Sequence, residues 1–154
     1  MRRILLLMVL AVSWTGFVQA DDIMMTGPEA EKVRKEILDL LDQKGKALME
    51  GGAAAVAFID RVEVDSILYG GGESRLTKAQ RMNEWRTGVR KMGSRNVREP
   101  RVRAYNNGNT AILDYIVDLD KSPELKPGEG LAPRTSHVVE IYVKHNNVWR
   151  MVAR

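Results

Sequence analysis

The sequence predicts an α+β fold, in which three helices precede an antiparallel sheet. Up to Gly93, apolar residues recur at steps of three and four, which is the period of a helix with one buried face. After Gly93 the period changes to two, as in strands with one buried face. The chain has no cysteine, so an apolar core rather than disulfides must hold the fold together.

The first predicted helix is long and opens at Thr26 and Glu29, which are spaced as a capping box. Gly51 and Gly52 end it, because glycine readily adopts the left-handed backbone of a helix terminus. A short second helix is expected from about residue 53. The apolar face of the first helix consists of residues at helical spacing: Val33, Ile37, Leu41 and Leu48.

A brief strand is predicted over Ser66–Tyr69, followed by a turn at Gly70–Gly72. A second capping box, Thr77 with Gln80, opens the third helix, which is predicted to continue to Gly93. Its apolar residues recur at three- and four-residue steps: Met82, Trp85, Val89 and Met92.

The last third of the chain predicts two β-hairpins. Residues 97–105 and 110–119 alternate as strands and are joined by Asn106–Asn109, a strong turn signal. Residues 120–133 contain proline and glycine repeatedly and are expected to form a long loop. Residues 136–145 and 148–153 predict the second hairpin, across Asn146 and Asn147.

The first 20 residues have the three parts of a signal peptide. Arg2 and Arg3 precede an apolar run, and Val18-Gln19-Ala20 provides compact residues at the cleavage site. We expect cleavage after Ala20, which leaves one domain over residues 21–154. The protein is then exported, either to the periplasm or out of the cell, without a membrane attachment. The apolar run is too short to span a bilayer comfortably, which argues against a retained anchor.

The order of these elements resembles the nuclear-transport-factor-2-like superfamily, and its SnoaL-like members in particular. Three segments carry the resemblance: RLTKAQRMNEW, RVRAYNNGNTAILDY and EIYVKHNNVWRMVAR, with residues 29–154 covered overall. The resemblance implies a cone, in which a strongly curved antiparallel sheet wraps the long helix and encloses a pocket. Its members include steroid isomerases, polyketide cyclases, dehydratases and domains that only bind ligands or dimerise, so fold analogy does not choose a function.

The steroid-isomerase function is not expected from the residues at the matching positions. That chemistry needs a tyrosine, a carboxylate base and a protonated carboxylic acid. The aligned positions hold Lys44 for the tyrosine, one of Ile67, Leu68 or Tyr69 for the base, and Val139 for the acid. We therefore assign no catalytic residue and expect a protein that is not an enzyme of this kind.

Strand alternation predicts which side chains line the pocket. Tyr115 and His137 are the polar groups expected on the inner face, and Trp85 would add an aromatic wall. Each has an ordinary alternative: a histidine bonded to backbone at a strand end, or aromatic rings that only pack in the core. The remaining inner face is predicted to be apolar, with Ala111, Leu113, Val117, Val139, Ile141, Val143, Trp149 and Met151.

The composition and motifs of the chain argue against metals, cofactors and nucleic acid as binding partners. Two histidines and no cysteine give no transition-metal site, and no motif for a cofactor is present. Nucleic acid is not expected, because the basic cluster lacks interleaved aromatic residues and is predicted to face solvent. This cluster consists of Arg95, Arg98, Arg101 and Arg103.

Three functions stay open at this point. We rank first an exported domain that binds an apolar or anionic small molecule or dimerises. Second is an enzyme of cyclase, dehydratase or hydrolase kind that uses His137 with Tyr115, and third is a protein–protein interaction module. A homodimer is expected through the outer sheet face, predicted to carry Ile112, Ile116, Val138 and Tyr142.

Overall fold

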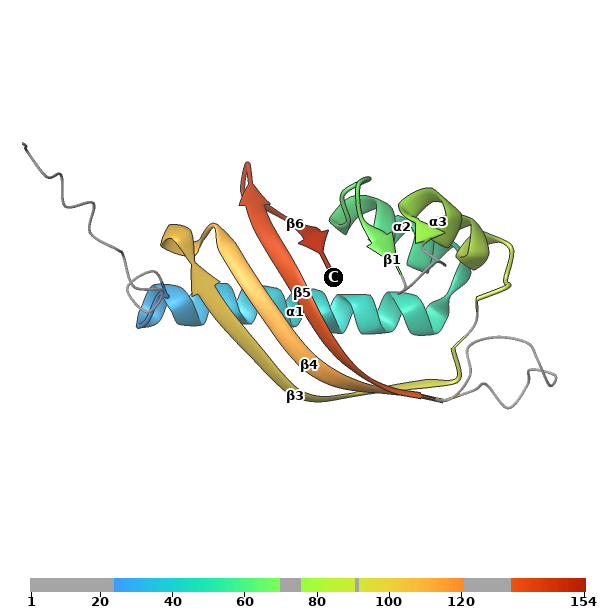
Figure 1. Cartoon of the computed structure of the whole chain (residues 1–154), viewed down its shortest axis with the longest axis horizontal. Helices are drawn as coiled ribbons and strands as arrows, with labels where there is room; N and C mark the ends of the chain where they lie inside the picture. Colours follow the sequence, from blue (N-terminus) through green and yellow to red (C-terminus); the bar gives the residue numbers. More distant parts are fainter. Residues whose placement is uncertain (1–23, 70–75, 91, 121–133) are drawn as a thin grey trace, which may run out of the picture.

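The fold is seen in a computed structural model, which describes residues 24–69, 76–90, 92–120 and 134–154 (Figure 1). The predicted signal peptide at residues 1–20, the turn at Gly70–Gly72 and residues 121–133 of the predicted loop lie outside the described residues. None of the described helices is both long enough and apolar enough to cross a membrane.

The long helix α1 spans Pro28–Glu50 and ends at Gly51, whose φ of 73° is in the left-handed region. Its N-cap is Gly27, and no side chain caps it, so the predicted capping box at Thr26 is wrong. The stripe that α1 buries contains one residue that is not apolar, Lys44. The whole stripe consists of Val33, Ile37, Leu41, Lys44 and Leu48.

Two shorter helices, α2 (Gly52–Val62) and α3 (Lys78–Arg86), pack against each other. Between them, β1 (Leu68–Tyr69) pairs with β2 (Leu76–Thr77). The capping box of Thr77 and Gln80 is confirmed, since each side chain bonds the other's backbone N–H. Helix α3 ends earlier than predicted, because Gly88 adopts a φ of 74° just after it.

A four-stranded antiparallel sheet follows, in the order β3-β4-β5-β6. The two predicted hairpins are confirmed, and their turns contain asparagines with positive φ. A register shift between Arg98 and Arg101 interrupts the β3–β4 pairing. The strands are β3 (Ser94–Tyr105), β4 (Thr110–Asp120), β5 (Arg134–His145) and β6 (Val148–Ala153).

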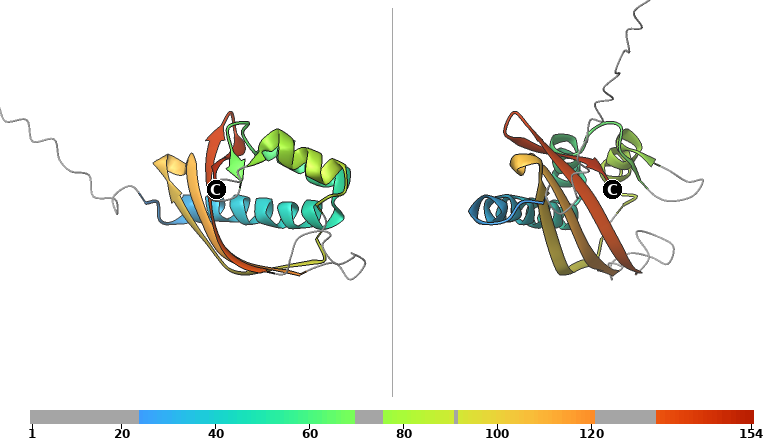
Figure 2. Two further views of the ribbon diagram at one scale, coloured as in Figure 1. Left: turned by 45° about the vertical axis from the view of Figure 1, so that its right-hand side comes forward. Right: turned by 60° about the vertical axis from the view of Figure 1, so that its left-hand side comes forward.

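The sheet curves around α1, which lies along its concave face (Figures 1 and 2). Helices α2 and α3 lie beyond β6, and Glu63 at the end of α2 forms a bridge with Met151 of β6. The prediction of an α+β fold with three helices and a curved antiparallel sheet is confirmed, whereas the pocket enclosed by that sheet stays a prediction. The main apolar core lies between α1, α2 and the concave face of the sheet.

The predicted inner faces are right for two strands and wrong for a third. In β4 the buried residues include Leu113 and Tyr115, as expected, and in β6 Trp149 and Met151 are buried. In β5 the buried set is Val138, Glu140 and Tyr142, whereas Val139 is 44% exposed. Alternation by hydrophobicity failed here because both faces of β5 carry apolar residues, and the buried face also carries a carboxylate.

Candidate functional site

A buried charge cluster occupies the middle of the concave face. The Nζ atom of Lys44 on α1 donates to Glu140 Oε1 on β5, and both residues are almost fully buried. Tyr115 Oη donates to the same oxygen at 3.1 Å, and Tyr142 Oη donates to Oε2 at 2.8 Å. Arg154 Nε lies 3.6 Å from Glu140 Oε1. One carboxylate is thus surrounded by four donor groups.

The electrostatics of this cluster keep its carboxylate ionised. Burial by itself raises the pKa of Glu140. The charges of Lys44 and Arg154 and the donated hydrogen bonds outweigh this effect, and the net pKa is about 2, below the ordinary value of 4.5. Burial lowers the pKa of Lys44 to about 8, although the charge of Glu140 opposes that change. Burial and the neighbouring carboxylate both raise the pKa of Tyr115 and of Tyr142. The two phenols therefore stay protonated and act as donors.

A second buried ion pair joins α3 to the end of α2. Arg81 Nη1 donates to both carboxylate oxygens of Glu63, at 3.0 and 3.1 Å. Beside it, Lys78 bonds the Asp60 carbonyl at 3.2 Å and Asp65 Oδ1 at 3.0 Å. These contacts fix α3 to α2 and to the segment that follows α2.

The three predicted ligand-binding residues do not share one cavity. Tyr115 is buried on the inner face and belongs to the charge cluster. His137 lies on the exposed side of β5, opposite Ile116, so its predicted inward orientation is wrong. Trp85 is buried in a second apolar cluster with Leu48, Ala55 and Ile59. Its Nε1 has no hydrogen-bond partner, alone among the fully buried side-chain polar atoms of the described residues.

Sequence reasoning missed Lys44 and Glu140 as partners. A signal was present, because Lys44 interrupts an otherwise apolar helical stripe, where an unpaired charge would be costly. The sequence alignment placed Val139 at the position of the isomerase's acid. The structure instead buries the next residue, Glu140, as an ionised carboxylate rather than as a protonated acid.

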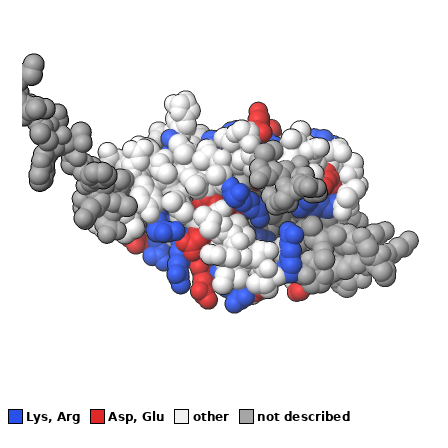
Figure 3. Space-filling view, viewed as in Figure 1, with Lys and Arg blue, Asp and Glu red and all other residues white. Residues whose placement is uncertain are grey.

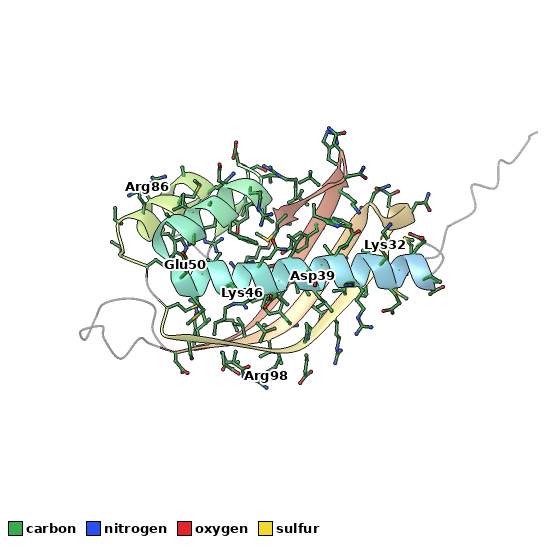
Figure 4. All side chains as sticks on the ribbon, turned by 180° about the vertical axis from the view of Figure 1, so that it is seen from behind. Lys32, Asp39, Lys46, Glu50, Arg86 and Arg98 are labelled. Carbon is green, nitrogen blue, oxygen red and sulfur yellow. The ribbon has the colours of Figure 1, made fainter. Side chains whose placement is uncertain are left out.

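An open groove of about 530 Å³ runs between α1 and β3. This volume falls in the range of roughly 300–1,000 Å³ that is usual for small-molecule sites. Figure 4 looks onto α1 from behind, with β3 crossing below it and the labelled Lys46 on the helix. Three charged residues line the groove: Asp42, Lys46 and Arg95. The rest of the lining is mainly apolar and consists of Leu38, Leu41, Met49, Val97 and Pro100.

Arg95 lies between the groove and the charge cluster. Its guanidinium carbon lies 5.7 Å from the centre of the Tyr115 ring, a cation–π distance. On its other side, a Cβ added at Gly45 of α1 would come within 3.0 Å of Arg95 Nη1. A larger residue at this position would therefore require the guanidinium to shift by a few tenths of an ångström. Arg95 is half-buried, unlike Arg98, Arg101 and Arg103, which face solvent as predicted.

A second, smaller hollow of about 320 Å³ lies at the other side of α1, beside the β5–β6 turn. Four of its polar side chains are already engaged in hydrogen bonds. Glu36 accepts from Lys144 Nζ and from Trp149 Nε1, both at 2.7 Å, and Arg61 donates to Gln43 at 2.9 Å. Charges of both signs are spread over the visible surface (Figure 3), and no group of metal ligands is found among the described residues.

The fold and these sites define a class: a small α+β cone domain, with a paired ionic interior and an open groove beside its long helix. Comparison with solved structures shows that this is the nuclear-transport-factor-2-like (NTF2-like) fold. No protein-family model and no curated protein matches the chain at the level of sequence.

Three solved structures illustrate the similarity. An NTF2-like protein from Cytophaga hutchinsonii has a TM-score of 0.64 at 14% identity, over 78% of this chain and 93% of its own. An NTF2-like protein of unknown function in nutrient uptake from Rhodospirillum rubrum has a TM-score of 0.62 at 16% identity, with 76% and 93% covered. A putative Ca/calmodulin-dependent kinase II association domain from Exiguobacterium sibiricum has a TM-score of 0.58 at 13% identity, with 84% and 93% covered.

Proposed function

We propose that this protein is an exported, non-catalytic domain that binds a small, largely apolar molecule in the groove between α1 and β3. The observation that carries the proposal is the groove itself, whose volume suits a small molecule and whose lining is mainly apolar. Met49 adds an apolar side chain that is 42% exposed at the same place. Burying these side chains under a ligand would provide the driving force for binding.

The interior of the cone supports a structural role rather than catalysis. A general base must offer a free acceptor to its substrate, but Glu140 already accepts hydrogen bonds from Lys44, Tyr115 and Tyr142. The proposed enzymatic pair of His137 and Tyr115 also loses its basis, since these side chains lie on opposite faces of the sheet.

Binding to the groove is tested with Nile red, a neutral dye whose fluorescence rises in apolar surroundings. The wild-type protein should bind the dye, and Leu38→Trp should lose most of this binding because the indole fills the groove. Leu40→Trp is the matched control: Leu40 is another half-buried leucine of α1, but it lines the smaller hollow. No dye binding, or equal effects of the two variants, would refute the proposal.

We also propose that the protein forms a homodimer through its outer sheet face. The composition of this face differs from the expectation, because Val138 and Tyr142 are buried inside. Half-exposed apolar residues nevertheless lie together there, and over the sheet in Figure 3 blue and red side chains lie beside uncharged ones. The apolar residues are Ile112, Ile116, Val139, Ile141 and Val143.

Export remains a proposal that rests on the sequence of residues 1–20. The pattern of two arginines, an apolar run and Val18-Gln19-Ala20 supports a signal peptide that is removed after Ala20. The domain, with its ligand-binding groove, would then act in the periplasm or outside the cell.

A further inference from the structure

We infer that the ligand of the α1–β3 groove is an amphipathic monocarboxylate, such as a medium-chain fatty acid, whose carboxylate binds Arg95. This inference rests on the proposed function and adds to it the chemical class of the ligand. It depends on the missing ion-pair partner of the Arg95 guanidinium among the described residues and on the contacts that hold this group at the edge of the groove.

Arg95 is a half-buried cation without an anionic partner among the described residues. Its neighbours on the strand differ: Arg98 bonds Asp118 at 2.7 Å, and Arg103 bonds Asp114 at 3.2 Å. Among the described residues, the contact that Arg95 makes is with the Tyr115 ring, which uses one face of the guanidinium and leaves its N–H donors unpaired within that part of the chain. An arginine fork with free donors matches the two oxygens of a carboxylate.

A glycine in α1 faces this guanidinium, and glycine lowers the intrinsic stability of a helix. Gly45 lies inside the helix, where glycine is less favourable than alanine. A Cβ at this position would lie 3.0 Å from Arg95 Nη1, a tight contact, so the guanidinium keeps its present place most easily beside a glycine. Gly45 and Tyr115 thus hold the guanidinium between α1 and β4, at the edge of the groove.

The rest of the groove selects the other end of the ligand. Its remaining lining is mainly apolar, which suits an aliphatic chain rather than a second charged group. The one carboxylate in the lining, Asp42, is paired with Lys46 Nζ at 2.7 Å. Its charge is therefore largely balanced at the rim, and among the described lining residues Arg95 is left as the charge without an ion-pair partner.

The experiment compares decanoate with decanol as competitors of Nile red on the wild-type protein. The two have the same aliphatic chain but differ in the charge of the head group. Hydrogen bonds to a charged group contribute about 1.5–3 kcal/mol, so decanoate should bind about 10- to 100-fold more tightly than decanol. Equal affinities would overturn the inference, whereas a failure of Nile red itself to bind would refute the proposed function.

Arg95→Met keeps an apolar stem and removes the charge, so it should raise the dissociation constant of decanoate to that of decanol. Because Arg95 also lines the groove, the deciding quantity is the ratio of the decanoate and decanol affinities on the same variant, which should fall to about one. Arg98→Met, in the same strand but on the outer face, is the control and should alter none of the three affinities. If the two variants weaken decanoate equally, Arg95 is not the anchor. If Arg95→Met does not fold, the wild-type comparison still decides the question.

Discussion

The buried pair of Lys44 and Glu140 allows a sharp test of how the interior is held together. The change is Glu140→Gln, which preserves the shape of the side chain and an acceptor oxygen for one of the two tyrosine hydroxyls. It removes the negative charge that faces Lys44, whose exposed fraction is 1%. Breaking a buried ion pair from one side costs about 3–5 kcal/mol, a large share of a typical stability of about 5–15 kcal/mol.

The pH dependence of the variant reports the same interaction. With Glu140 in place, burial lowers the pKa of Lys44 to about 8, from an ordinary value of 10.5. Without Glu140 this pKa falls further, because the opposing charge is gone. The folded state then binds fewer protons than the unfolded state, so the stability of Glu140→Gln should rise with pH, up to the ordinary pKa of lysine.

Urea unfolding, followed by tryptophan fluorescence and circular dichroism, measures these free energies. Lys44→Met in the Glu140→Gln background should recover part of the loss, because it removes the unpaired buried cation. Lys46→Met is the control, since Lys46 and Asp42 are both exposed and water screens their ion pair. The reasoning is refuted if Glu140→Gln costs no more than Lys46→Met, or if the double variant loses the full sum of the single losses.

Four further predictions follow from the interior, the sheet and the N-terminus. The pKa of Glu140 is lowered from 4.5 to about 2, so the stability that this carboxylate gives to the folded state is complete above pH 4.5 and is lost as the pH falls to 2. The free energy of unfolding should therefore fall more steeply with acid for the wild type than for Glu140→Gln. Trp149→Ala should cost about 3–5 kcal/mol in urea unfolding, because the indole is buried and donates to a carboxylate, whereas His137→Ala, on the exposed face, should cost less than about 0.5 kcal/mol. Light scattering should give a dimer that Val139→Asp dissociates; a wild-type monomer at micromolar concentration would contradict the proposed interface. Amino-terminal sequencing of exported protein should begin at Asp21, and a full-length chain in the membrane fraction would disprove cleavage.

Local signals in the sequence were enough to predict most of the secondary structure. Glycine and asparagine marked the helix end at Gly51 and the turns of both hairpins, because these residues tolerate positive φ. The inner face of β4 was also predictable, since Asp114 and Asp118 mark the opposite face of an otherwise apolar strand. The end of α3 was not predicted, because the helical spacing of apolar residues continues past Gly88 although the helical backbone ends before it.

The sequence by itself determined the α+β class, the order of the elements and the turns, because these depend on residues close together in the chain. The buried face of β5 was decided by tertiary structure, since Glu140 can be buried only beside Lys44, 96 residues earlier. The candidate ligand site has the same origin. Arg95 is one of four arginines in a basic segment, and only its place between Gly45 and Tyr115 distinguishes it. Pairing and desolvation act between residues that the fold brings together, and no local pattern records which charges will meet.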